Sequence, residues 1–166
     1  MYISFNISME FVLHGVKFKY EDDKVYRWYE FKNIADEWRE IKIHFDTGYY
    51  SFRFLIKKKT YKIRLHRLIY WLHNPHWDIF DSSKDNCIDH IDGNTRNNNI
   101  ENLRVVTHQQ NQWNRTRAKG YNWDKCSKKW KAQIQVNCIA KHIGLYENKE
   151  DARQAYLDAK KIYHII

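Results

Sequence analysis

The sequence is poor in cysteine and has no long hydrophobic run. The three cysteines are odd in number, widely spaced and without a Cys-x-x-Cys pair: Cys87, Cys126 and Cys138. This pattern argues against a structural zinc site and predicts a reducing compartment. No stretch approaches the roughly 20 apolar residues that span a bilayer. Residues 1–10 also lack the basic start and apolar core of a signal peptide. We therefore expect a cytoplasmic protein without a membrane segment.

Acidic residues are outnumbered by basic ones, and aromatic residues are plentiful. The 166 residues include 29 Lys and Arg against 20 Asp and Glu, which gives a formal net charge of +9. A basic surface favours a polyanionic partner such as nucleic acid, because neutralised phosphates release counterions. A merely soluble basic protein is the alternative. Apolar residues make up 43% of the chain, with 7 Trp, 12 Tyr and 8 Phe, so a core can form and wholesale disorder is disfavoured.

Residues 1–60 are predicted to form a β-rich region. Runs of β-branched and aromatic residues at 24–31 and 49–56 predict strands. A further strand is predicted at 60–65, and the three lysines that separate it from the strand before predict a hairpin. The stretch 34–41 predicts a short helix instead.

Residues 61–116 are predicted to form a ββα unit preceded by a helix. The predicted elements are a helix at 66–72, strands at 87–91 and 103–106, and a helix from 108 to about 119. The first helix is expected to end before Pro75, because the residue before proline disfavours the helical conformation. An asparagine-rich loop joins the two strands. Thr107 fits a helix N-cap, and Gln110 three residues later completes a capping box.

Residues 88–111 concentrate side chains suited to phosphodiester cleavage. That reaction needs a base to activate water and a cation to neutralise the phosphate and the leaving oxygen. His90 is the candidate base, because histidine titrates near neutral pH. Asp89 and the amide oxygen of Asn111 supply the oxygen ligands that Mg²⁺ or Mn²⁺ prefers. Asn102, just before the second strand, is a candidate for tying down the loop and orienting His90.

The adjacency of Asp89 and His90 raises a geometric difficulty. Neighbouring residues on a regular strand point to opposite faces. Both side chains can serve one site only where the strand is bulged, twisted or ends. The Asp92-Gly93 pair that follows makes such an irregularity plausible.

The spacing of these residues resembles that of a known family of nucleases. The run Asp89-His90-Ile91-Asp92-Gly93, followed by Asn102, Thr107 and Asn111, is similar to the HNH endonucleases and closest to the branch found in phage homing endonucleases. The resemblance implies that His90 is the general base and that Asp89 and Asn111 bind one divalent metal ion. It also implies a structural role for Asn102, which helps to orient the base.

Residues 117–166 are predicted to form three strands and a final helix. The strand at 130–136 alternates cleanly, with Lys131, Gln133 and Gln135 on the face opposite its apolar side chains. Asn148 is predicted to cap the last helix, whose alanines face the sheet. A small sheet can enter the DNA major groove, where glutamine pairs with adenine. The same alternation also fits an ordinary amphipathic strand.

This C-terminal pattern resembles the plant Apetala-type, ethylene-response-factor DNA-binding domain. The residues that carry the resemblance are Gly120, Trp123, Trp130, Ala132, Ile134, Gly144 and the helix motif from Glu150 to Tyr156. It implies that the sheet lies in the major groove and that Gln133 and Gln135 touch bases. His142 matches a third-strand position at which that family often contacts DNA.

The sequence therefore predicts an α+β chain with regions 1–60, 61–116 and 117–166. We expect a site-directed, divalent-metal-dependent DNA endonuclease of homing type, which acts on double-stranded DNA as a monomer or homodimer. Arg104 and Arg115 are candidate phosphate contacts. As the product of a phage or another mobile element, it would work in the host cytoplasm. Two alternatives remain open: a dimeric restriction-type HNH endonuclease, and a catalytically inactive DNA-binding protein that keeps the fold.

Overall fold

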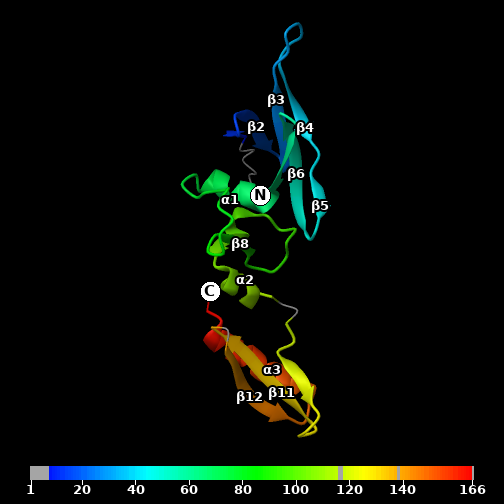
Figure 1. The fold of residues 1–166 in the computed structure, drawn as a ribbon, viewed down its shortest axis with the longest axis vertical. Helices are drawn as coiled ribbons and strands as arrows, with labels where there is room; N and C mark the ends of the chain where they lie inside the picture. The colour runs from blue at the N-terminus through cyan, green and yellow to red at the C-terminus, as the bar shows by residue number, and fades with distance from the viewer. Residues whose placement is uncertain (1–7, 116–117, 138, 166) are drawn as a thin grey trace, which may run out of the picture. The chain divides into compact units, whose positions relative to one another are not determined.

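The computed structural model describes residues 8–115, 118–137 and 139–165 (Figure 1). It confirms the predicted α+β class, with small antiparallel sheets and a few helices. The chain divides into two compact units, residues 1–81 with 94–103 and residues 82–93 with 104–166. Across the described ranges, no helix has the length and apolar character needed to cross a membrane.

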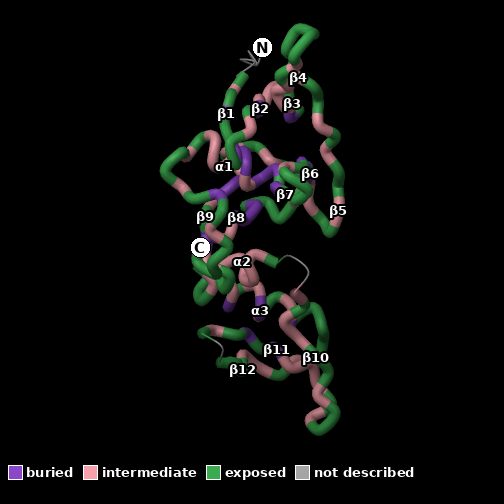
Figure 2. Tube along the Cα trace, turned by 45° about the horizontal axis from the view of Figure 1, so that its top comes forward, coloured by how far each residue is buried: buried purple, intermediate pink, exposed green. Residues whose placement is uncertain are grey.

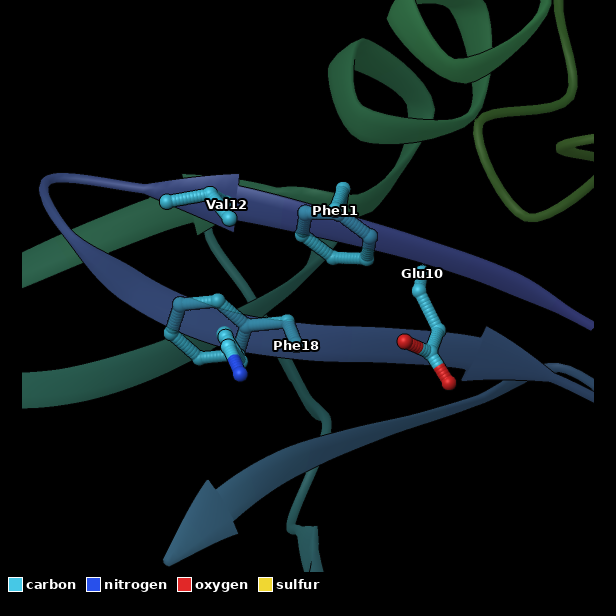
Figure 3. A pocket seen from close by; sticks show the side chains of 5 residues that line it. Glu10, Phe11, Val12 and Phe18 are labelled. Atoms are coloured by element: carbon cyan, nitrogen blue, oxygen red, sulfur yellow. The ribbon is translucent and has the colours of Figure 1, made fainter.

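The first unit begins with a four-stranded antiparallel meander. Its strands are β1 (Met9–Leu13), β2 (Val16–Glu21), β3 (Lys24–Tyr29) and β4 (Glu37–Ile41). Phe11 and Phe18 face each other across the first hairpin, with ring centroids 5.5 Å apart, and both are buried (Figure 3). The shallow pocket drawn there is lined by Glu10, Phe11, Val12, Lys17 and Phe18, and it holds none of the predicted site residues.

The helix predicted at 34–41 is wrong, because β4 occupies residues 37–41. Trp38 pairs directly with Trp28 of β3, and the two rings lie 5.1 Å apart. Cross-strand aromatic pairs stabilise a sheet. This pairing outweighs the weak helical tendency of the isolated segment.

A three-stranded sheet and a helix complete the first unit. They are β5 (His44–Asp46), β6 (Tyr49–Ile56), β7 (Lys59–Arg64) and α1 (Leu65–His73). The predicted lysine hairpin is confirmed: Lys57 and Lys58 both have positive φ, as a tight two-residue hairpin turn requires. Helix α1 packs on β6 and β7 through Leu68 and Ile69, and it ends before Pro75 as predicted. Figure 2 shows the buried residues of this unit gathered around these elements.

The second unit contains the predicted ββα elements. They are β8 (Cys87–His90), β9 (Leu103–Val106), which follows the 3-10 turn η1 (Ile100–Asn102), and α2 (His108–Trp113). The capping box is confirmed, since Thr107 Oγ1 accepts from Gln110 N and Gln110 Oε1 accepts from Thr107 N. The prediction that α2 reaches residue 119 is wrong, because Asn114 ends the helix and its side chain bonds to β8.

The C-terminal part of this unit is a three-stranded sheet with one helix on one face (Figure 1). Its elements are β10 (Tyr121–Asp124), β11 (Lys129–Val136), β12 (Ile139–Tyr146) and α3 (Lys149–Tyr163). Ile134 packs against Tyr156 and Ala159 of α3, as the apolar alternation predicted. Asn148 is the N-cap residue of α3, but its amide donates to Asp151 Oδ2 instead of capping the backbone.

Gly120 is required where the chain enters β10. Its φ is +75°, and a Cβ atom there would overlap the ring of Tyr156. We expect Gly120→Ala to lower the unfolding free energy of this module by about 2–4 kcal/mol, because backbone strain adds to overpacking. Hydrogen exchange of the β11 and α3 amides measures the effect in the full chain.

Gly48→Ala is the matched control for this prediction. Gly48 also has a positive φ, +85°, yet nothing lies within 4 Å of a Cβ placed there. Gly48→Ala should therefore lower the unfolding free energy of its own sheet only by the smaller cost of backbone strain. Equal effects of the two substitutions would contradict the close approach of Gly120 to Tyr156.

Candidate active site

The candidate catalytic pair lies at the buried end of β8. Ile88, Asp89 and His90 are 6%, 5% and 3% exposed, so three consecutive side chains are covered on both faces of the strand. The strand ends at His90, where Gly93 N donates to His90 O at 2.8 Å and Gly93 takes a φ of +71°. The neighbours Asp89 and His90 could serve one site only where the strand is irregular or ends, and β8 ends at His90.

Two side chains satisfy the Asp89 carboxylate. Arg104, on β9, donates to Oδ2 from Nη2 at 2.9 Å and from Nε at 3.0 Å. Asn114, just after α2, donates from Nδ2 to Oδ1 at 3.0 Å and to Oδ2 at 3.1 Å. A buried carboxylate is tolerated when paired and hydrogen-bonded in this way. Removing Arg104 would leave the Asp89 charge buried without its ionic partner, which is costly.

Asn111 lies on the same side of α2 as Asn114. Its backbone N–H donates to Thr107 O at 3.0 Å in the first helical turn, and the residue is half-buried. Residues three apart share a helix face. Since α2 packs on β8 and Asn114 contacts Asp89, this spacing predicts that Asn111 also faces the β8 end. Metal binding by Asn111 stays a prediction.

Asn102 organises the asparagine-rich loop within the first unit. Its Nδ2 donates to Asn97 O at 2.8 Å, and its backbone N donates to Asn99 O at 2.9 Å. The side chains of Asn94, Asn97 and Asn99 each accept from a backbone N–H two residues later, which is the Asx-turn geometry. These turns form the predicted asparagine-rich loop, whereas the orientation of His90 by Asn102 stays a prediction.

The structure also describes the surroundings of Arg115, a candidate phosphate contact, and of two histidines, His108 and His66. Arg115 is exposed, and its carbonyl accepts from Lys160 Nζ at 3.4 Å. His108 is an exposed residue of the first turn of α2, and its Nε2 lies 3.0 Å from the Gln112 amide nitrogen. His66 is buried beside Tyr49, with ring centroids 5.0 Å apart. Asn114 was not identified from the sequence as a site residue. The only sequence signal for it is that it follows Asn111 by three residues.

The two predicted ligands, Asp89 and Asn111, carry oxygen donors of the kind that hard divalent cations prefer. Within the described ranges, no cluster of three or more His, Cys, Asp or Glu side chains could hold a metal ion. The site offers one carboxylate, on Asp89, and one amide side chain on the neighbouring helix face, on Asn111. Mg²⁺ characteristically keeps several waters and binds through one or two carboxylates together with substrate phosphates. Such a set suits Mg²⁺ or Mn²⁺ better than Zn²⁺.

The predicted DNA-reading residues lie on the sheet face opposite α3. Gln133 and Gln135 are exposed, whereas Ala132 and Ile134 between and beside them are buried. The register between β11 and β12 shifts after Ala132, which brings Gln133 directly opposite His142. Lys131 is half-buried and pairs with Asn122 of β10. These side chains therefore form one polar, solvent-facing surface.

Comparison with known proteins agrees with this geometry for the central segment. Residues 64–113 match the family model of HNH endonucleases. The match spans α1, β8, β9 and α2, and it includes Asp89, His90, Asn102 and Asn111. This segment is an HNH endonuclease domain, and nuclease activity is the function it indicates. Neither the curated proteins nor the solved structures include a match to the chain.

Proposed function

We propose that the chain is a divalent-metal-dependent DNA endonuclease of the homing type. The observation that carries the proposal is the buried Asp89–His90 pair at the end of β8, inside the segment that matches the HNH endonucleases. A bound Mg²⁺ or Mn²⁺ would neutralise the scissile phosphate and the leaving oxygen. Asp89 and Asn111 would hold it, while the His90 imidazole takes the proton from the attacking water.

The proposed stoichiometry is one catalytic site per chain. A monomer would then nick one strand, and a double-strand cut would need a dimer or two sequential events. Mapping cuts on both strands of a supercoiled plasmid separates this proposal from a dimeric restriction-type enzyme, which would cut a short symmetric target. A protein that binds but never cuts would be the inactive alternative.

His90→Ala should abolish cutting while leaving DNA binding nearly intact, because general-base catalysis contributes about 10²–10⁴ in rate. Plasmid nicking with Mg²⁺ measures the chemistry, and fluorescence anisotropy on a duplex measures binding. Addition of EDTA should stop the wild-type reaction. His108→Ala, at an exposed surface histidine, should cut normally. A fully active His90→Ala protein would show that another group is the base.

The C-terminal sheet is proposed to read the DNA major groove. Its span, residues 121–146, carries five lysines and a single acidic residue, Asp124. Its exposed glutamines stand where bidentate pairing with adenine is possible. The face opposite is occupied by α3, so this is the side of the sheet open to a duplex.

Replacing both Gln133 and Gln135 by alanine should change which DNA sites are cut. The rate of cleavage at any one site should change less than the choice of site. Each bidentate base contact is worth about 1–3 kcal/mol of discrimination. Sequencing the cut ends from a plasmid library gives the readout. Gln154→Ala, on α3 where the amide bonds Asp158, is the control that should leave the map unchanged. An identical cleavage map for the double variant would remove the reading role.

The β5–β6–β7 sheet is proposed to contact the phosphate backbone. Residues 42–64 contain a single acid, Asp46, and seven basic residues: Lys42, Arg53, Lys57, Lys58, Lys59, Lys62 and Arg64. Residues 9–41, by contrast, contain eight acids and six basic residues. The Lys62 ammonium holds the pKa of Asp46 below its ordinary value, so this one acid stays ionised and paired. The positive charge is thus concentrated on one of the two N-terminal sheets.

Changing Lys57, Lys58 and Lys59 to glutamine should weaken binding uniformly across DNA sequences. The slope of log affinity against log salt should fall by about 0.9 for each phosphate that the variant no longer neutralises. Lys17, Lys24 and Lys32, exposed in the region with the excess of acids, provide the matched triple control. Equal salt slopes for the two triple variants would contradict a specific role for this sheet.

A further inference from the structure

Asn114 joins the two residues to which different catalytic tasks are assigned. Its Nδ2 lies 2.7 Å from His90 O and 3.0 Å from Asp89 Oδ1. It stands at the C-cap of α2, one residue beyond the segment that matches the HNH family. A single amide group therefore holds both the carboxylate of one residue and the main chain of the next.

The chemistry of these partners fixes the orientation of the amide. A carboxylate and a backbone carbonyl only accept hydrogen bonds, and an amide nitrogen carries two hydrogens. The amide nitrogen faces His90 O at 2.7 Å, the two Asp89 oxygens at 3.0 and 3.1 Å, and Ile91 O at 3.5 Å. A rotated amide would set its own oxygen against these four acceptor oxygens. The site thus requires a neutral donor at this position.

The two oxygens of Asp89 have different surroundings. Oδ2 accepts both bonds from Arg104, whereas Oδ1 accepts only the bond from Asn114 among the contacts that the structure describes. A cation on Oδ2 would lie beside the guanidinium charge and be repelled. Oδ1, which does not bond to the guanidinium, is therefore the oxygen that we assign to a metal ion.

We propose that Asn114 is a positioning residue of the nuclease site. It holds the Asp89 carboxylate in the rotation that presents Oδ1 to the divalent ion, and it fixes the β8 end that carries the His90 imidazole. This role rests on the proposed metal-dependent cleavage. Partners that orient metal ligands typically influence metal affinity or activity by about 10–100-fold, and small misplacements of a reacting group are costly.

The test compares Asn114→Ala with Asn74→Ala in the full chain. Asn74 is a matched control, because it is also a half-buried helix C-cap whose Nδ2 donates to a backbone carbonyl, that of Tyr70 at 3.0 Å. Plasmid nicking across a Mn²⁺ series gives the saturating rate and the half-saturating Mn²⁺ concentration separately. We expect Asn114→Ala to raise the half-saturating concentration about tenfold and to lower the saturating rate. Asn74→Ala should change neither.

A second readout does not depend on turnover. In a His90→Ala background with duplex DNA bound, Mn²⁺ binding is followed by the loss of the free-ion electron paramagnetic resonance signal. Adding Asn114→Ala should weaken this binding by a similar factor. Asn114→Leu, which keeps most of the side-chain volume, should show the same loss. It replaces the alanine variant if that protein fails to fold.

The outcomes separate this role from the proposed function. Wild-type protein that neither cuts DNA nor binds Mn²⁺ would overturn both. Wild-type protein that cuts, with Asn114→Ala matching it in rate and Mn²⁺ dependence, would overturn the positioning role alone. A lower melting temperature for Asn114→Ala with unchanged Mn²⁺ binding would make Asn114 a structural cap and would equally end the proposal.

Discussion

The packing of β8, β9 and α2 in the second unit depends on satisfying one buried carboxylate. Asp89 is 5% exposed, and an ionised group at that depth is stable only if donors surround it. Arg104 supplies them from β9 and Asn114 from the end of α2. The same contacts therefore pair two short strands and hold a six-residue helix, which would be marginal alone. The contacts that hold these elements together are therefore also contacts of the candidate site.

Local sequence signals predicted the fold where the determining contacts are local. The strand at 49–56, the lysine turn and the Thr107 capping box are set by neighbouring residues, and all three are present. The predicted Asn148 cap fails through a local contact with Asp151, whereas the other two errors involve distant partners. Trp38 becomes part of a strand because Trp28 lies across from it, and α2 ends early because the Asn114 side chain bonds to Asp89 and His90 on β8. Neither partner is visible within a window of a few residues.

The candidate site shows the same division. Asp89, His90, Asn102 and Asn111 follow from spacing, and the family match covers all of them. The sequence indicates only a phosphate contact for Arg104, because an arginine on a basic protein has no evident internal partner. The structure pairs it with Asp89 through Nε and Nη2, which uses two of its five N–H donors. Its side chain is 27% exposed, so the remaining donors are compatible with a phosphate contact as well.

In the proposed enzyme the protein supplies few ligands to the metal ion, and this affects how the enzyme would select its DNA sites. One carboxylate and one amide would bind Mg²⁺ weakly, and substrate phosphate together with water would fill the rest of the coordination shell. Tight metal binding would then require the duplex to be held at the site, and the sheets at residues 42–64 and 121–146 both carry an excess of basic residues that could hold it. Backbone contacts set position without reading sequence, whereas groove contacts discriminate between bases. On this proposal the lysine-rich N-terminal sheet supplies affinity, and the exposed glutamines of β11 supply the choice of site.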